Sequence, residues 1–240
     1  MDGHDGAVCQ LLCAAFSAVC IGRIGAGGRA GKAAHRLGVS GDGRADVRLH
    51  LYGHVPHQTV TFAALTALCL FLNTKTRLAA GLTPLFVLCG TMVWYSTLGS
   101  VHMLVPAGIV WFGAAAAACV WLWRKHKDIR WREFFSPAMV YFLLASLAVI
   151  VLFAVRRPIF NEWDEFSFWG IAPKVVKTEN QLYTYNPGEM RVSTFVPGII
   201  MLDYAFQFLG SVFVPWKVYA AYDILFFAVF AAAISMLGRR

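Results

Sequence analysis

Apolar residues fall along the chain in runs separated by short polar or basic stretches. A helix needs about 20 mostly apolar residues to cross roughly 30 Å of hydrocarbon. The runs Leu82–Leu98, Leu104–Trp123 and Pro137–Val155 approach this length, whereas Val60–Leu72 crosses only if flanking residues extend it. The pattern therefore predicts an all-α fold, a polytopic bundle of transmembrane helices.

The same pattern divides the chain into a weakly apolar N-terminal segment with a basic Gly-rich loop, a set of transmembrane helices, a long polar loop, and two further transmembrane helices. These parts are residues 1–57, 58–155, 156–195 and 196–240. The last part is predicted to cross twice, as Val196–Val214 and Lys217–Leu237. The sequence leaves open whether residues 6–22 also cross. The long loop is expected to carry short helices at the membrane interface.

Composition and charge support a membrane location. Hydrophobic residues make up 58% of the chain and charged residues 14%, against about 25% charged in soluble domains, and mean hydropathy is +0.59. The net charge of +8 resides mainly in loops between apolar runs, which indicates contact with anionic lipid and excludes nucleic acid as the expected partner. We expect a multi-pass integral protein of the bacterial inner (plasma) membrane.

The side of each loop follows from its basic residues. Arg124–Arg132 holds five Lys or Arg in nine residues, so the positive-inside rule places it in the cytoplasm. Pro137–Val155 then runs outward, and residues 156–195 are extracytoplasmic. Two further crossings would leave Arg239 and Arg240 outside, against the rule.

The long loop holds an unusual concentration of acid. Glu162, Asp164 and Glu165 are three of the chain's 13 acidic residues. Asp164 or Glu165 could act as a general base or bind a divalent cation such as Mg²⁺ or Mn²⁺, with Asp164 the candidate metal ligand. The alternative is a structural role for Asp164. A carboxylate near the start of a short interfacial helix caps the helix and interacts favourably with its dipole. Adjacent residues diverge by about 100° on a helix, so Asp164 and Glu165 are not expected to share one role.

Other residues of this loop are candidates for substrate binding. Lys174 could pair with a phosphate as a point charge, or its ammonium could snorkel to the interface. Tyr183 belongs to a Tyr-rich turn that could line a substrate groove, and Arg191 is a second candidate phosphate contact.

Two acids fall inside the last predicted spans, Asp203 and Asp223. Intramembrane carboxylates are functional candidates by default, although a hydrogen bond from Tyr204, Tyr219 or Tyr222 would also explain them. They support an alternative function, a transporter or flippase-like protein in which these acids carry the coupling. A third possibility is a non-catalytic membrane assembly subunit.

A family resemblance rests on three segments taken together. A span ends in Arg157-Pro158, WDEFSFWGIAPKVV follows at 163–176, and FVPGIIMLDYAF opens the next apolar run at 195–206. This order resembles the GT-C-type membrane glycosyltransferases, including relatives of the protein O-mannosyltransferases and the lipid A aminoarabinose transferase. Their first extracytoplasmic loop carries an acidic pair followed by short juxtamembrane helices. The resemblance covers Val155–Leu237.

The resemblance implies transfer of a sugar from a polyprenyl-phosphate-linked donor to a glycan, lipid or protein acceptor on the extracytoplasmic face. Asp164 matches the first acidic position, which serves as catalytic base or helps bind a metal where one is used. Glu165 matches the second and would orient the substrate or bind the donor. Family members usually carry more helices, and their acidic loop follows the first of them. We therefore expect this chain to be an N-terminal portion of such an enzyme.

Overall fold

The computed structural model describes residues 55–162, 164, 168–185 and 197–237. Within these residues helices are the only regular secondary structure, and five are long and apolar enough to cross a membrane. They are His57–Thr76, Ala80–Gly99, Leu104–Arg124, Pro137–Arg156 and Pro215–Leu237. The prediction of an all-helical protein with several membrane-length helices is confirmed.

The α-helices in chain order are α3 (Val55–Thr76), α4 (Thr83–Gly99), α5 (Leu104–Arg124), α6 (Trp131–Phe134), α7 (Pro137–Arg156), α8 (Ile171–Glu179), α9 (Gly198–Gln207) and α10 (Pro215–Leu237). Single 3₁₀ turns lie at η1 (Ala80–Leu82), η2 (His126–Asp128) and η4 (Tyr183–Tyr185). The predicted N-terminal segment lies almost entirely outside the described residues, so the question of residues 6–22 stays open.

Helix α3 is longer at both ends than the apolar run that predicts it. Its hydroxyl groups bond to carbonyls one turn earlier, Thr61 Oγ1 to His57 O at 3.0 Å and Thr74 Oγ1 to Leu70 O at 2.8 Å. Such bonds satisfy polar side chains within the helix itself. Polar flanking residues therefore extend the short run to 22 residues, a length that can cross a bilayer.

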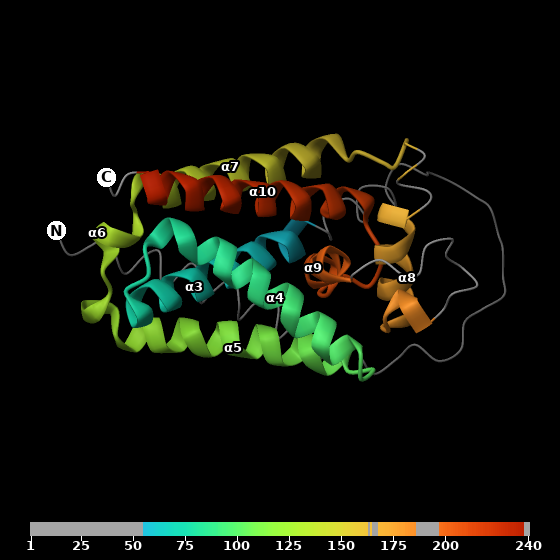
Figure 1. Ribbon diagram of the computed structural model, residues 1–240, viewed down its shortest axis with the longest axis horizontal. Helices are drawn as coiled ribbons and strands as arrows, with labels where there is room; N and C mark the ends of the chain where they lie inside the picture. Colours follow the sequence, from blue (N-terminus) through green and yellow to red (C-terminus); the bar gives the residue numbers. More distant parts are fainter. Residues whose placement is uncertain (1–54, 163, 165–167, 186–196, 238–240) are drawn as a thin grey trace, which may run out of the picture.

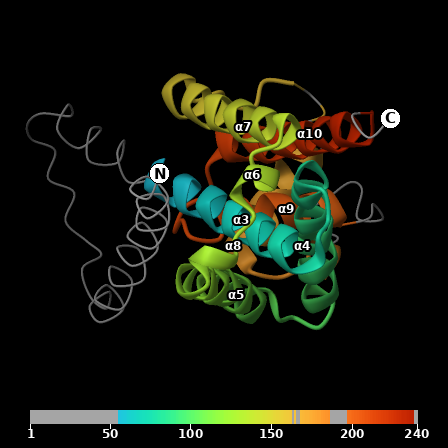
Figure 2. The same cartoon turned by 90° about the vertical axis from the view of Figure 1, so that its left-hand side faces the viewer.

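Helices α5, α7 and α10 run along the long dimension of the molecule, and α4 crosses it diagonally (Figure 1). Helices α7 and α10 pack against each other in opposite directions on one side, while α3, α4 and α5 form the other side. Helix α9 lies between these groups and contacts α3, α4 and α10 (Figure 2). All of its residues from Ile200 to Gln207 are buried, so α9 forms part of the protein core.

The bundle has two ends of different character (Figure 1). We call one the basic end: it comprises the α3–α4 turn, the α5–α7 connection and the last turn of α10. Its basic side chains are Lys75, Arg77, Arg124, Lys125, Lys127, Arg130 and Arg132. Arg130 Nη2 donates to Asn73 O at 2.8 Å and joins two of these segments. We call the other the loop end: it comprises the α4–α5 turn, α8, the segment after α7 and the turn before α10.

The prediction that Val196–Val214 forms a membrane-crossing helix is wrong for the described part of that segment. Helix α9 has ten residues, which at 1.5 Å per residue is about 15 Å, half of the hydrocarbon thickness. The helix stops because the chain turns at Phe208–Gly210 and returns to start α10 at Pro215. Helix α10 consequently begins at the loop end and finishes at the basic end.

Candidate functional site

Helix α8 lies across the loop end of the bundle, roughly perpendicular to the long helices (Figure 1). Ala172, Val175 and Val176 face inward and join the hydrophobic core, while Lys174 is exposed. The helix begins at Ile171, so Pro173 lies in its first turn, where a backbone N–H would have no partner within the helix. Asn180 ends the helix in a left-handed conformation, with φ of 54°. Pro173 and Asn180 thus set the ends of α8, and its apolar inward face leaves Lys174 on the outer side.

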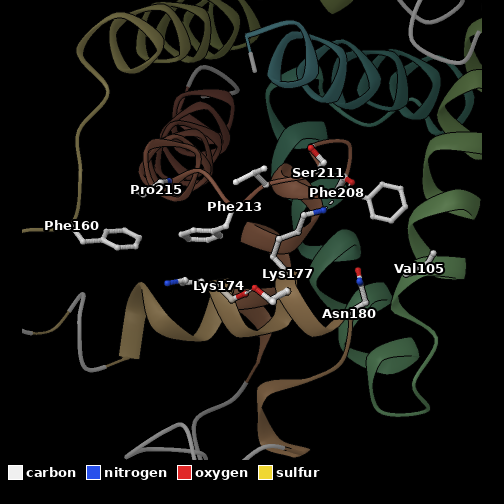
Figure 3. Close-up of a pocket in the computed structure, with 12 residues that line it drawn as sticks. Val105, Phe160, Lys174, Lys177, Asn180, Phe208, Ser211, Phe213 and Pro215 are labelled. Atoms are coloured by element: carbon white, nitrogen blue, oxygen red, sulfur yellow. Dashed lines mark hydrogen bonds between the residues drawn. The ribbon is translucent and has the colours of Figure 1, made fainter. Parts of the chain in front are cut away.

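A pocket of about 770 Å³ opens beside α8 (Figure 3). Lys174, Lys177 and Thr178 of α8 form one wall, and the turn Gly210–Phe213 forms the facing wall. Phe160, which follows α7, and Pro215 at the start of α10 close one side. The pocket therefore gathers segments from four places in the sequence at the loop end.

The turn that forms the second wall is held by one glutamine. Gln207 Nε2 donates to Val214 O at 2.7 Å, and Val214 N donates to Gln207 Oε1 at 3.1 Å. Gly210 N also donates to Gln207 O at 3.1 Å. The Gln207 side chain is fully buried, so these bonds are shielded from water and fix the turn. This wall is preformed.

The pocket is positively charged. Lys174 and Lys177 line it, and the described lining includes no carboxylate. Lys177 Nζ donates to Phe208 O at 3.3 Å and extends toward the turn, whereas Lys174 extends toward Phe160 and Phe213 (Figure 3). Two cations at separate places in one cavity favour an anionic ligand such as a phosphate.

Apolar residues border the charged part of the pocket. Val212 is 55% exposed and Val105 is 41% exposed, and both line the cavity. The Phe160 ring packs against Phe213, with centroids 6.1 Å apart. A ligand with an anionic group and an apolar chain would find both kinds of surface here.

Glu162 and Asp164, the described acids of the long loop, lie at the same end of the bundle. Asp164 is exposed and follows Phe160, a lining residue, by four positions, at most about 14 Å of extended chain. Glu165 lies outside the described residues. Among the described residues no group of three or more His, Cys, Asp or Glu could hold a metal ion. The described acids of this stretch, Glu162 and Asp164, do not by themselves supply a coordination set, so the predicted divalent cation enters no step below.

Tyr183, another predicted substrate contact, is not brought to this pocket. Tyr183 is fully buried, and its ring packs edge-to-face on Phe168 with centroids 5.6 Å apart. Burial raises the pKa of Tyr183, and the residue is not among those that line the pocket. It contributes to the core beneath α8. Arg191 lies outside the described residues.

Asp203 is 1% exposed on the buried helix α9, and neither carboxylate oxygen has a hydrogen-bond partner within the described chain. Burial raises the pKa of Asp203 well above its usual range. The hydrogen bonds from tyrosine that would explain this acid are not formed. Tyr204 donates instead to Asn180 Oδ1 at 2.9 Å, and Tyr219 donates to Ile159 O at 3.3 Å. Tyr222 lies close enough to interact electrostatically, but its hydroxyl also lacks a partner in the described part.

Two lysines of the site went unrecognised in the sequence. Lys177 stands three positions after Lys174, the spacing that places two side chains on one helix face, so it could have been found. Lys217 resembles an ordinary interface lysine at the start of an apolar run, yet its side chain is fully buried beside Gly210. Only the packing of α10 against its neighbours reveals it.

Comparisons with known proteins give no matching family model, no matching curated protein and no matching solved structure.

Proposed function

We propose that this chain is, or forms part of, a membrane glycosyltransferase. It would transfer a sugar from a polyprenyl-phosphate-linked donor to a glycan, lipid or protein acceptor at the loop end of the bundle. The observation that carries the proposal is the lysine-lined pocket with an apolar border, within a few residues of the acidic stretch. Lysines would hold the phosphate, and the exposed apolar residues would receive the first part of the polyprenyl chain.

Each side chain has a definite task in the reaction. The acceptor hydroxyl oxygen attacks the anomeric carbon of the donor, and the bond from that carbon to the phosphate oxygen breaks. Asp164 accepts the hydroxyl proton as general base. The departing phosphate oxygen takes the bonding electron pair, and Lys174 and Lys177 stabilise its negative charge. Glu165, by its match to the second acidic position of the GT-C pattern, would orient the donor.

The proposal is tested with the full chain in proteoliposomes, supplied with a panel of radiolabelled polyprenyl-phosphate sugars and with envelope lipids and glycans as acceptors. Asp164→Asn keeps the side-chain size and removes the base. General-base catalysis contributes about 10²- to 10⁴-fold, so transfer should fall at least about 100-fold. Asp128→Asn at the basic end, where the side chain is 64% exposed, is the matched control and should leave transfer unchanged. Wild-type-like transfer by Asp164→Asn would refute the role of this residue.

The unpartnered carboxylate of Asp203 favours a second function, ion- or proton-coupled transport. A buried acid with a raised pKa can take up and release a proton during a transport cycle. The chemistry predicts that Asp203→Asn abolishes substrate flux while Asp164→Asn leaves it intact. The reverse pattern, with loss of sugar transfer in Asp164→Asn alone, supports the glycosyltransferase.

A further inference from the structure

Lys217 carries a buried ammonium group without a counter-charge. Its side chain has no exposed surface, and Nζ has no hydrogen-bond partner within the described residues. An unpaired ion in a protein interior costs several kcal/mol relative to water. An anionic ligand bound nearby would offset this cost, so the surroundings of Nζ are informative.

The ammonium lies next to the wall of the pocket. Nζ is 3.5 Å from the position that a Cβ of Gly210 would occupy, and Gly210 lines the cavity. Lys217 itself does not line the cavity, so its charge would act on the pocket from behind the turn. Lys177 holds the same turn through Phe208 O and interacts electrostatically with Lys217. Two ammonium groups thus converge on the Phe208–Gly210 turn.

The three lysines are spread over the pocket at different depths. Lys174 is exposed and reaches toward Phe160, Lys177 is half-buried and reaches toward the turn, and Lys217 is buried behind Gly210. One phosphate group bound beside Lys177 and Lys217 would leave Lys174 without an anion, because Lys174 points to the other end of the cavity (Figure 3). A ligand with two linked anionic groups would place a negative charge near each of the three lysines.

We propose that the pocket binds a diphosphate. The inner phosphate contacts Lys177 at the Gly210–Ser211 turn, with the positive charge of Lys217 close behind Gly210, and the outer phosphate contacts Lys174. This inference rests on the proposed function and sharpens it, since it assigns the donor to the polyprenyl diphosphates. The same chemistry would accept a free inorganic diphosphate, and the test separates the two sources.

The test measures dissociation constants of the purified full chain in nanodiscs at fixed ionic strength. The probes are inorganic phosphate, inorganic pyrophosphate, farnesyl monophosphate and farnesyl diphosphate. We expect each diphosphate to bind at least about tenfold more tightly than the matching monophosphate, a difference of about 1.4 kcal/mol. Tighter binding of farnesyl diphosphate than of pyrophosphate identifies a lipid ligand, whereas equal binding identifies the free anion and overturns the lipid-linked donor.

Lys217→Met is the critical variant. Replacing a buried charge by a hydrophobic side chain of similar volume is often neutral or stabilising, so the variant should fold. It should lose the preference for diphosphate, while Lys127→Met at the basic end should keep it. Gly210→Ala is a second variant: its methyl group would lie 3.4–3.5 Å from its neighbours, an ordinary contact, and beside Lys217 Nζ. It should weaken diphosphate binding at least about threefold.

Equal affinities for the mono- and diphosphates, or an unchanged preference in both Lys217→Met and Gly210→Ala, would overturn the inference. Its failure is separable from that of the proposed function. Transfer from monophosphate donors that needs Asp164 but not Lys217 would retain the glycosyltransferase and refute the diphosphate site. Diphosphate binding without any sugar transfer would retain the diphosphate site and refute the glycosyltransferase.

Discussion

Gly108 of α5 supports the pocket through the aromatic ring of Phe208. A Cβ at Gly108 would lie 2.5 Å from Phe208 Cδ2 and closer still to two further atoms of that ring. The ring has little freedom to move, because it stacks on Phe112 with centroids 5.6 Å apart and is 5% exposed. The Gly108→Ala substitution should therefore displace Phe208, whose carbonyl accepts the bond from Lys177.

The expected magnitude follows from a comparison within the same helix. Inserting a methyl group into a packed core costs about 1–3 kcal/mol, whereas replacing glycine by alanine in a helix gains about 1 kcal/mol in propensity. A Cβ at Gly113 meets no atom within 4 Å, so Gly113→Ala takes the propensity gain alone. That gain cancels between the two variants. Gly108→Ala should therefore be about 1–3 kcal/mol less stable than Gly113→Ala.

The assay is thermal unfolding of the full chain in detergent, followed by tryptophan fluorescence. For a chain of this size about 1 kcal/mol shifts the midpoint by roughly 2–4 °C, so the two variants should differ by about 2–12 °C. Pyrophosphate affinity should also fall in Gly108→Ala and stay unchanged in Gly113→Ala. Equal midpoints for the two variants would refute the argument that the Gly108–Phe208 contact positions the pocket wall.

Two further predictions concern stability. The raised pKa of Asp203 means that the folded state binds its proton more tightly than the unfolded state does, so this stabilisation is full below about pH 4, the usual range of an Asp. It is lost as pH rises through the folded-state pKa. Asp203→Asn should therefore remove this pH dependence of the unfolding free energy, measured by denaturant titrations at several pH values. An unchanged pH dependence in the variant would contradict the assignment. At the start of α7, Ser136 Oγ accepts a hydrogen bond from Met139 N at 3.4 Å. Ser136→Ala should therefore lower the unfolding free energy by about 1 kcal/mol in the same titrations. An unchanged unfolding free energy would mean that this bond contributes nothing.

The fold was predictable from sequence where a run of apolar residues forms one continuous helix. It was not predictable between 196 and 214, where the run is long enough to cross but the chain turns back. The turn depends on Gln207, whose amide bonds to Val214 from both sides, and on the space that Gly108 leaves for Phe208. A hydropathy profile averages over neighbouring residues, so it cannot predict a contact between distant segments. Gly210 and Pro215 were the local signals of a break.

The candidate site was predictable only in outline. Lys174 reaches the pocket, because a helix with an apolar inner face must turn its lysines outward. Tyr183 lies in the core instead, since the sequence could not show that Phe168 would pack on it. Lys217 was missed for a related reason. A lysine at the start of an apolar run normally extends to the interface, and only the packing around α10 buries it.

The direction of α10 bears on which side of the membrane the pocket faces. Because α9 does not cross, α10 runs opposite to α7 and ends at the basic end, and Arg239 and Arg240 follow directly in the sequence. The end of α10 at Leu237 therefore lies at the end of the bundle that also holds Arg124–Arg132, which agrees with the positive-inside rule. The rule then predicts a cytoplasmic basic end and an extracytoplasmic loop end. Asp164 and the lysine pocket would then both lie on the extracytoplasmic face, the side on which the proposed transfer from a lipid-linked donor would take place.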